Sequence, residues 1–403
     1  MGAFLVVAVF LVAAAARAEV EVKTLAGELD GAVGGVAVDS LGYVYVADFG
    51  EKVWKISPFG EVEVFVDQLY GASGNTLDPE GNLLQSSFHG GYVSKIARDG
   101  SVSTLARGIA GPVGVALDAA GNTVVCACRS NSLVRITPAG EVEDFASSPL
   151  LNCPNGITRG PQGELYVVNF SDGRMLKVSQ EGDVSEFAVI PGGGNGHVVF
   201  AGGVFYVTGF RSNRIYQVTS AGEVRAFAGT GAFSDTDGPA SEATFASPNG
   251  IAFDGTRRIL YVNDYLVPFL QRFQQPPRSS VRRMALPNLT RAFDEAFAEG
   301  GFEAAVAAYR AFRVANPGAF TEIETNALGY RYLQQGKVAE ALRIFELNTE
   351  DYPKSFNAWD SLGEAMKAAG RTEDAVRHYR KSLELNPGNT NAVKMLEELG
   401  AEP

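Results

Sequence analysis

Residues 35–64 read GVAVDSLGYVYVADFGEKVWKISPFGEVEV. Apolar and polar residues alternate over short stretches of this segment, a pattern that predicts β-strands. A strand over Gly35–Asp39 is followed by a turn at Gly42 and by strands over Tyr43–Val46 and Val53–Ile56. The turn Gly60-Glu61-Val62 then opens a fourth strand.

This unit repeats along the chain. The turn tripeptide recurs every 40 to 42 residues, at Gly60-Glu61-Val62, Gly100-Ser101-Val102, Gly140-Glu141-Val142, Gly182-Asp183-Val184 and Gly222-Glu223-Val224. The first strand recurs in register at 115–118, 157–159, 198–200 and 251–254. Short strands repeated in series at this period are typical of propeller blades, so the sequence predicts an all-β propeller over residues 19–285.

The count of units predicts how the ring closes. Five units are complete, and a sixth begins at Pro248 and has a third strand over 280–284 but no fourth strand. The segment Glu19-Val20-Glu21-Val22 repeats the residues of 61–64. We therefore expect six blades, with the N-terminal strand completing the last one and leaving no long free edge.

The sixth unit carries a family resemblance. Its motifs are Ala228-Gly229-Thr230-Gly231, Asp237-Gly238, Ala243-Thr244-Phe245, Pro248-Asn249-Gly250-Ile251-Ala252 and Leu260-Tyr261-Val262-Asn263-Asp264, and together they resemble an NHL repeat. The other units are similar to the wider superfamily of NHL and gluconolactonase-like (senescence-marker) propellers. This resemblance implies the fold but not one activity, because the superfamily includes lactonases, lyases and binding modules.

Residues 288–400 change to a helical period. Gly300, Ala305, Tyr309 and Pro317 recur at matching offsets as Gly336, Ala341, Phe345 and Pro353, and as Gly370, Ala375, Tyr379 and Pro387. This pattern resembles tetratricopeptide repeats, so an all-α helical array is expected, with a capping helix over 391–399. The resemblance implies contact with a protein or peptide; alternatively, so short an array caps the propeller or mediates dimerisation.

The first 18 residues are interpreted as a signal peptide. An apolar run over Ala3–Ala16 precedes the small-x-small pattern Ala16-Arg17-Ala18, which predicts a periplasmic or secreted protein without a stable membrane span. Removal of this segment changes the formal net charge from −12 to −13, because it contains one arginine. So acidic a chain is not expected to bind nucleic acid.

Three cysteines leave at least one thiol unpaired: Cys126, Cys128 and Cys153. Export permits a disulfide. Cys126 and Cys128 lie on one face of a strand, so each is expected to pair with Cys153 rather than with the other. The alternative is that all three are small buried side chains.

Polar residues are predicted to gather at the mouth of the propeller, where the innermost strands begin and the second strands end. The candidate ligand-binding residues there are Asn75, Asn155, Asn169, Asn195, Asn249, Arg129, Asp48 and Asp264. Five rings and Arg129 directly follow the second strands and suggest either packing between blades or an aromatic collar: Phe49, Phe88, Phe170, Phe210 and Tyr265. An apolar insertion over 266–279 is expected to be a lid or a docking surface for the array.

The gluconolactonase-like resemblance implies a divalent cation in the channel, such as Ca, Zn or Mn. The candidate ligands are Asn155, Asn195 and Asp264. Gly34 and Asn195 stand where that family has acidic ligands, and hard cations need anionic oxygen. Asp48 and Asp264 could supply it, or they could be turn residues that bond backbone N–H groups.

His89 and His197 are candidate catalytic residues, because blades 2 and 5 face each other across a six-fold ring. The alternative is a surface histidine and an inner-strand histidine bonded to backbone. No nucleophile elbow or phosphate loop is present. The sequence favours an exported binding or scaffold protein that takes a small ligand or peptide at the mouth and recruits a partner through its repeats. The alternative is a metal-dependent lactone or ester hydrolase, or a propeller lyase.

Overall fold

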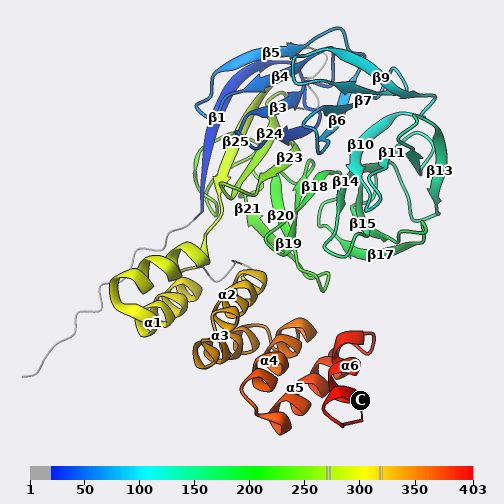
Figure 1. The fold of residues 1–403 in the computed structure, drawn as a ribbon. Coiled ribbons are helices and arrows are strands. Elements are labelled where there is room, and N and C mark those ends of the chain that lie inside the picture. Colours follow the sequence, from blue (N-terminus) through cyan, green and yellow to red (C-terminus); the bar gives the residue numbers. More distant parts are fainter. Residues whose placement is uncertain (1–19, 269–270, 272–273, 317–318, 320, 403) are drawn as a thin grey trace, which may run out of the picture.

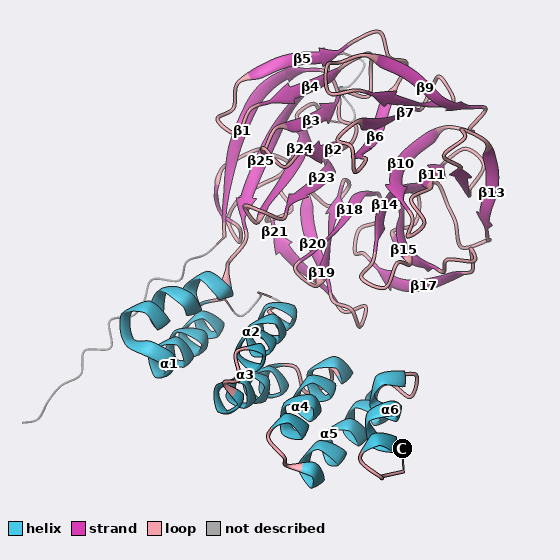
Figure 2. Ribbon diagram, viewed as in Figure 1, coloured by secondary structure: helices cyan, strands magenta, loops and turns pink. Residues whose placement is uncertain are grey.

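The computed structural model describes residues 20–268, 271, 274–316, 319 and 321–402, and the predicted signal segment lies outside them. Six antiparallel sheets surround a central channel, and a helical array follows (Figures 1 and 2). The prediction of a six-bladed propeller followed by tetratricopeptide helices is confirmed. None of the helices among the described residues is long and apolar enough to cross a bilayer.

Blades 1 to 5 each contain four strands, which follow one another from the channel outward. Blades 1 and 2 consist of β2 (Val36–Val38), β3 (Val44–Ala47), β4 (Val53–Ile56), β5 (Val62–Val66), β6 (Ala72–Leu77), β7 (Leu83–Ser87), β8 (Tyr92–Ile96) and β9 (Val102–Arg107). Blades 3 and 4 consist of β10 (Pro112–Leu117), β11 (Thr123–Ala127), β12 (Ser132–Ile136), β13 (Val142–Ser147), β14 (Pro154–Arg159), β15 (Leu165–Asn169), β16 (Arg174–Val178) and β17 (Val184–Val189). Blade 5 consists of β18 (Asn195–Ala201), β19 (Val204–Gly209), β20 (Arg214–Val218) and β21 (Val224–Ala228).

Blade 6 contains five strands and joins the two ends of the propeller. Its order from the channel is β23 (Pro248–Asp254), β24 (Ile259–Tyr265), β25 (Arg278–Ala285), β1 (Glu21–Asp30) and β22 (Gly238–Pro239). β1 pairs antiparallel with β25, where the sequence places the closing strand. The outermost strand β22 was not predicted, because two residues leave no visible alternation.

A buried ion pair holds the closing strand in blade 6. The Arg282 side chain is fully buried and contacts both Asp264 and Asp237. The Asp237 carboxylate also accepts hydrogen bonds from the backbone N–H and the hydroxyl of Thr24 in β1, each at 2.9 Å. One guanidinium therefore connects β24, the segment before β22 and the N-terminal strand.

A ring of glycines sets the distance between neighbouring blades. Each innermost strand, or the residue before it, contributes one member of this glycine ring: Gly35, Gly74, Gly114, Gly156, Gly196 and Gly250. A Cβ on Gly114 would lie 2.2 Å from the Asn155 carbonyl oxygen, and one on Gly156 would lie 2.5 Å from the His197 Cα. The six strands thus approach one another closely enough around the channel to exclude any side chain at these positions.

Gly114→Ala is expected to destabilise the propeller by about 1 to 3 kcal/mol, because the added methyl group must displace the backbone of blade 4. Gly255→Ala is the matched control, since its Cβ would meet only a Phe253 ring carbon at 3.8 Å. Urea unfolding of both variants measures the difference. Equal stabilities would contradict the close packing of the ring.

The helical array packs as stacked helix pairs. It contains α1 (Leu289–Ala315), α2 (Glu322–Gln334), α3 (Val338–Asp351), α4 (Phe356–Ala368), α5 (Thr372–Leu385) and α6 (Thr390–Glu398). Gly301 has a φ of 73° inside α1, so this element is two helices joined at a kink, which form the first pair. A Cβ on Gly329 would lie 2.5 Å from the Phe345 ring, and Gly363 faces Tyr379 in the same way. Small residues therefore allow the two helices of a pair to cross closely.

The array leaves the propeller at the face opposite the mouth. β25 runs parallel to the innermost strand β23, because both pair antiparallel with β24, so Ala285 ends where the innermost strands end. At this face the Arg258 guanidinium donates to the Pro287 carbonyl oxygen and forms an ion pair with Glu324 of α2. Both charged side chains are mostly buried, and burial raises the pKa of Glu324.

Arg258→Gln is expected to loosen the array, because it leaves Glu324 without its ion-pair partner, at a cost of at most about 3 kcal/mol. Proteolysis around residues 286–288 should become faster while the unfolding of the propeller is unchanged. The double variant Arg258→Gln/Glu324→Gln should recover part of the loss, since no unpaired charge remains. Unaltered proteolysis in the single variant would exclude this anchor.

Candidate functional site

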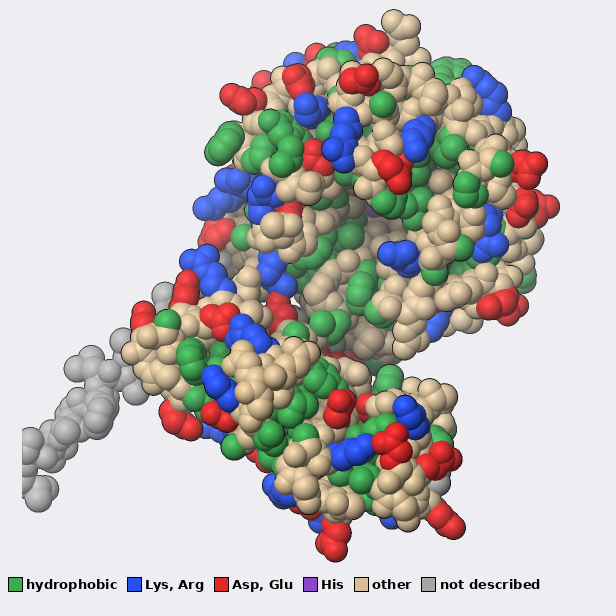
Figure 3. All heavy atoms as spheres, viewed as in Figure 1, with side chains coloured by type: hydrophobic (Ala, Val, Ile, Leu, Met, Phe, Trp, Pro, Cys, Tyr) green, Lys and Arg blue, Asp and Glu red, His purple; other side chains and the backbone are tan. Residues whose placement is uncertain are grey.

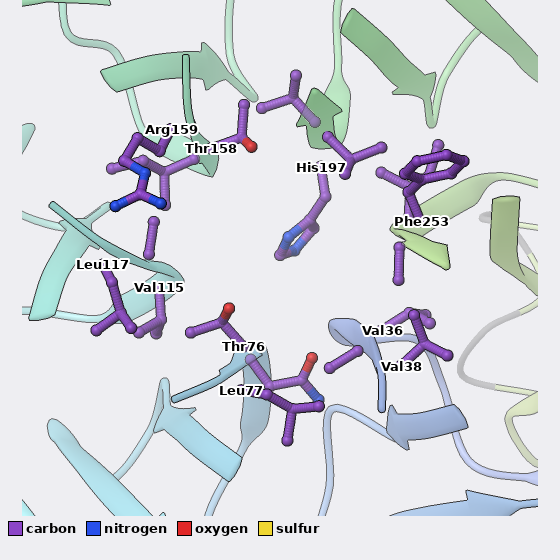
Figure 4. Close-up of a pocket in the computed structure, with 18 residues that line it drawn as sticks. Val36, Val38, Thr76, Leu77, Val115, Leu117, Thr158, Arg159, His197 and Phe253 are labelled. Carbon is purple, nitrogen blue, oxygen red and sulfur yellow. The ribbon is translucent and has the colours of Figure 1, made fainter. Parts of the chain in front are cut away.

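The central channel contains a cavity of about 420 Å³, shown in Figure 4. Its lining begins in every blade with the residue that follows the glycine ring and continues for two further residues. The lining residues are Val36, Ala37, Val38, Asn75, Thr76, Leu77, Val115, Ala116, Leu117, Ile157, Thr158, Arg159, His197, Val198, Val199, Ile251, Ala252 and Phe253. This channel cavity therefore occupies the half of the channel beyond the glycine ring, toward the face from which the array leaves.

The space-filling view shows the same relation between the channel and the array. A hollow with a histidine at its floor opens in the propeller, and the helical array lies beside it (Figure 3). The sequence predicted a ligand site at the mouth, where the innermost strands begin. The channel cavity lies near the other ends of these strands.

His197 extends from the wall of the channel cavity toward its centre (Figure 4). Its backbone N–H donates to the Thr208 hydroxyl at 2.8 Å, and Thr208 also bonds the carbonyl of Asn249 in the next blade. The side chain is 8% exposed, and its Nε2 has no hydrogen-bond partner among the described residues. Burial lowers the pKa of His197 to about 4, so the imidazole is neutral at pH 7.

Asn75 lines the channel cavity from blade 2. Its Nδ2 donates to the Gln85 Oε1 at 3.2 Å, and Gln85 in turn donates to the Ser73 carbonyl at 2.9 Å. The Asn75 Oδ1 is buried and has no partner among the described residues. The cavity thus has a neutral imidazole and an amide oxygen that are both free to bond a ligand.

The asparagines at the mouth connect blades. The Asn155 Nδ2 donates to the Gly196 carbonyl oxygen at 2.8 Å, and the Asn249 Nδ2 donates to that of Gly34 at 3.0 Å. Asn169 bonds the Leu150 carbonyl at 2.8 Å within its own blade. Asn195 is fully buried, and neither polar atom of its side chain has a partner among the described residues. Two of the five predicted mouth amides therefore tie neighbouring blades together.

The two candidate acids at the mouth are held in different ways. The Asp48 carboxylate accepts from the backbone N–H groups of Gly50 and Lys52 at 2.7 and 3.0 Å, which is the turn geometry that was the alternative expectation. Asp264 is fully buried and lies 3.2 Å from the Arg282 guanidinium. Burial raises the pKa of both carboxyl groups.

The residues at the mouth do not fit a hard divalent cation. Of the two carboxylates that could supply anionic oxygen, Asp264 forms an ion pair with Arg282 through one oxygen, and Asp48 is bonded to the backbone of its own turn. The Asn155 amide nitrogen donates to backbone carbonyl oxygens. The atoms that Asn155 and Asn195 could offer to a cation are neutral amide oxygens. Over the described part of the chain, no group of three or more His, Cys, Asp and Glu side chains could hold a metal ion. A cation needs anionic oxygen ligands that this arrangement does not supply.

The rim of the mouth is aromatic, and its rings touch across blades. The Phe49 and Phe88 ring centroids lie 5.5 Å apart, and those of Phe170 and Phe210 lie 5.7 Å apart. The Arg129 guanidinium lies over the Phe88 ring at 4.6 Å. These rings are half-buried, so packing between blades and a collar of partly exposed rings are both present. Tyr265 is also half-buried at the end of β24.

The two candidate catalytic histidines have different surroundings. His89 is exposed at the mouth face and packs against Tyr70, Phe49 and Phe88, whereas His197 is buried in the channel cavity. The third histidine, His378, is half-buried in the array, where its ring stacks on Trp359 at 5.5 Å.

The insertion between β24 and β25 lies at the mouth face. Residues 269–270 and 272–273 of this segment lie outside the described residues, and Val267 is buried. The array is anchored at the other face through Arg258, so the insertion is not its docking surface.

The cysteines resolve into one disulfide and one thiol. Cys128 of blade 3 is bonded to Cys153, which directly precedes the innermost strand of blade 4. Cys126 is a buried free thiol, and burial raises its pKa. The expected disulfide to Cys153 is therefore formed by Cys128, and Cys126 is the small buried side chain of the alternative expectation.

Comparison with known proteins relates both modules to known classes. The model of the virginiamycin B lyase family matches residues 50–242, and that of the tetratricopeptide repeat matches residues 356–389. Superkiller complex protein 3 of Homo sapiens is 35% identical over 65 residues, which are 16% of this chain and only 4% of that protein.

Solved structures share the propeller fold. A gluconolactonase from Xanthomonas campestris is 18% identical, with 68% of this chain and 92% of that chain covered at a TM-score of 0.53. An auxiliary nutrient binding protein from Bacteroides ovatus is 16% identical, with 67% and 77% covered at a TM-score of 0.55. The chain is thus a six-bladed propeller joined to tetratricopeptide helices. Its propeller is related in sequence to the virginiamycin B lyase family and shares its fold with gluconolactonase-like propellers.

One residue of the channel cavity and one behind its wall were not predicted from the sequence. Arg159 stands where the other five blades have apolar residues, so no repeat pattern points to it. Thr208 has a counterpart in Ser86, whose hydroxyl also bonds a carbonyl of the next blade, and this repeat could have pointed to it. The glycine ring could have been found, because a glycine recurs at the same position of the innermost strand in all six blades.

His197→Gln is expected to make stability less dependent on pH. The pKa of His197 is about 4 in the folded chain and 6.5 for the ordinary side chain, so the unfolded state binds more protons between these values. The free energy of unfolding should therefore fall by about 3 kcal/mol more in the native protein than in the variant as the pH drops from 7 to 4. Urea unfolding at several pH values measures this; parallel curves would show that the imidazole is solvated.

Proposed function

We propose that this chain is an exported binding protein whose channel cavity takes a small molecule and whose helical array recruits a protein partner. One observation carries the proposal: His197 and Asn75, which line the channel cavity, have buried polar atoms without partners among the described residues. A buried polar atom without a hydrogen bond costs about 1 to 3 kcal/mol, and a ligand that bonds it removes this cost. Buried sites of this kind, apolar with few polar groups, are typical of ligand pockets.

A propeller with a ligand cavity and an array of tetratricopeptide helices together suit the recruitment of a protein partner. Tetratricopeptide helices are protein-binding repeats, and their array stands beside the open end of the channel cavity. A ligand in the cavity and a partner on the array would therefore be held at the same face of the propeller. The Arg258–Glu324 ion pair would keep the two sites in a fixed relation.

Export is part of the proposal. It is supported by the signal-like first 18 residues and by the Cys128–Cys153 disulfide, since disulfides persist in oxidising compartments. The acidic surface and the tetratricopeptide match favour a protein partner over nucleic acid.

The alternative is an enzyme, a metal-dependent lactone or ester hydrolase or a lyase. The match to the virginiamycin B lyase family favours it. The donor set at the mouth argues against a metal-dependent reaction there, because Asp264 is paired with Arg282 and the amides are neutral.

The test is a thermal-shift screen of small molecules against the mature full-length protein with EDTA present. A ligand at one hundred times its Kd stabilises the folded state by about 2.7 kcal/mol, which raises the melting temperature measurably. We expect compounds that stabilise the native protein but not Val38→Trp/Leu117→Trp, because both residues line the channel cavity and the added rings would occupy it. Phe253 at the equivalent position of blade 6 indicates that an aromatic ring is accommodated there.

Leu41→Trp is the matched control, since Leu41 is 66% exposed outside the cavity and the variant should respond like the native protein. Compounds that stabilise both variants equally would locate binding elsewhere. Stabilisation that requires added metal, together with turnover of lactones or esters, would contradict the proposed binding function and favour the metal-dependent enzyme.

A further inference from the structure

Apolar and polar blades are interspersed around the channel cavity. Blades 1, 3 and 6 contribute only aliphatic or aromatic lining residues. The polar lining residues come from blades 2, 4 and 5: Asn75, Thr76, Thr158, Arg159 and His197. Blade 3 separates blade 2 from blade 4, and blades 2 and 5 face each other, so a ligand that fills this cavity needs an apolar body that meets polar groups on opposite walls.

Arg159 is the one charged residue of the described lining, because the imidazole of His197 is neutral. The other five blades have Val38, Leu77, Leu117, Val199 and Phe253 at the same position. The Arg159 side chain is exposed at the open end of the cavity, and its one hydrogen bond among the described residues goes to the Asp118 carbonyl at 3.3 Å. It forms no ion pair with a carboxylate of the described chain, so its charge is available to an anion.

His197 and Asn75 lie deeper, directly beyond the glycine ring. The neutral imidazole can donate a hydrogen bond through Nε2, and the Asn75 Oδ1 can accept one. A hydroxyl group does both, so it would satisfy either of these atoms. The two ends of the cavity thus differ in chemistry, with a cation at the opening and neutral hydrogen-bonding atoms at the inner end.

We propose that the channel cavity binds a small, largely apolar carboxylate that also carries a hydroxyl group, with the carboxylate at Arg159 and the hydroxyl at His197 and Asn75. This proposal rests on the proposed function, of which it names the ligand class. A guanidinium matches a carboxylate with two parallel hydrogen bonds, which a neutral ester cannot form. The apolar body would lie against the aliphatic walls of blades 1, 3 and 6.

The test is isothermal titration of the mature full-length protein with three probes: 3-(4-hydroxyphenyl)propionate, its methyl ester, and 3-phenylpropionate. We expect the hydroxy acid to bind about tenfold more tightly than the ester, since a charge-assisted hydrogen bond is lost in the ester. It should also bind more tightly than 3-phenylpropionate, which lacks the hydroxyl.

Arg159→Gln should abolish the difference between acid and ester, and because Arg159 is exposed this variant keeps the fold. Arg107→Gln is the matched control, since Arg107 is exposed on the outermost strand of blade 2, and it should leave the difference unchanged. Asn75→Leu should remove the preference for the hydroxyl while retaining the preference for the acid.

Equal affinities for acid and ester, an Arg159→Gln variant that still discriminates, or no binding of any probe would each overturn the carboxylate proposal. These failures are distinguishable from failure of the proposed function. Uncharged compounds whose stabilising effect disappears in Val38→Trp/Leu117→Trp would retain the channel cavity as a ligand site of another class.

Discussion

The close approach of the six innermost strands is the constraint on which the propeller depends. At each member of the glycine ring, a Cβ would come within 2.2 to 2.7 Å of the next blade. Backbone then packs directly on backbone, and polar side chains that reach across it bond the neighbouring carbonyls, as Asn155 and Asn249 do. The same constraint fixes where the channel cavity begins, because side chains can enter the channel only beyond the glycines.

The polar groups of the channel are used in two ways. At the mouth, Asn155 and Asn249 tie blades together, and Asp264 forms an ion pair with Arg282 in the blade that closes the ring. Among the described residues, Asn195 at the mouth, and His197 and Asn75 beyond the glycine ring, retain buried atoms without partners. A buried polar atom that the fold does not use indicates binding more strongly than one that holds the fold together.

The array adds a second site at the same face. β25 brings the chain out beside the open end of the channel cavity, and the mostly buried Arg258–Glu324 pair fixes the first repeats against blade 6. The propeller and the tetratricopeptide helices would otherwise be two independent modules joined by a short linker. The anchor makes their relative position part of the structure.

The sequence by itself determined the architecture, because strand alternation, the 40- to 42-residue period and the Gly, Ala and aromatic offsets of the helices are local patterns. The match between 19–22 and 61–64 was enough to place the closing strand. Which polar residues are free was decided only by the tertiary structure. Bulges at or beside the ring glycines, as between Asn195 and Val198, change which side chains face the channel. Hydrogen bonds to the next blade occupy other polar side chains, such as that of Asn155. Both depend on contacts between segments about 40 residues apart, which no single repeat contains.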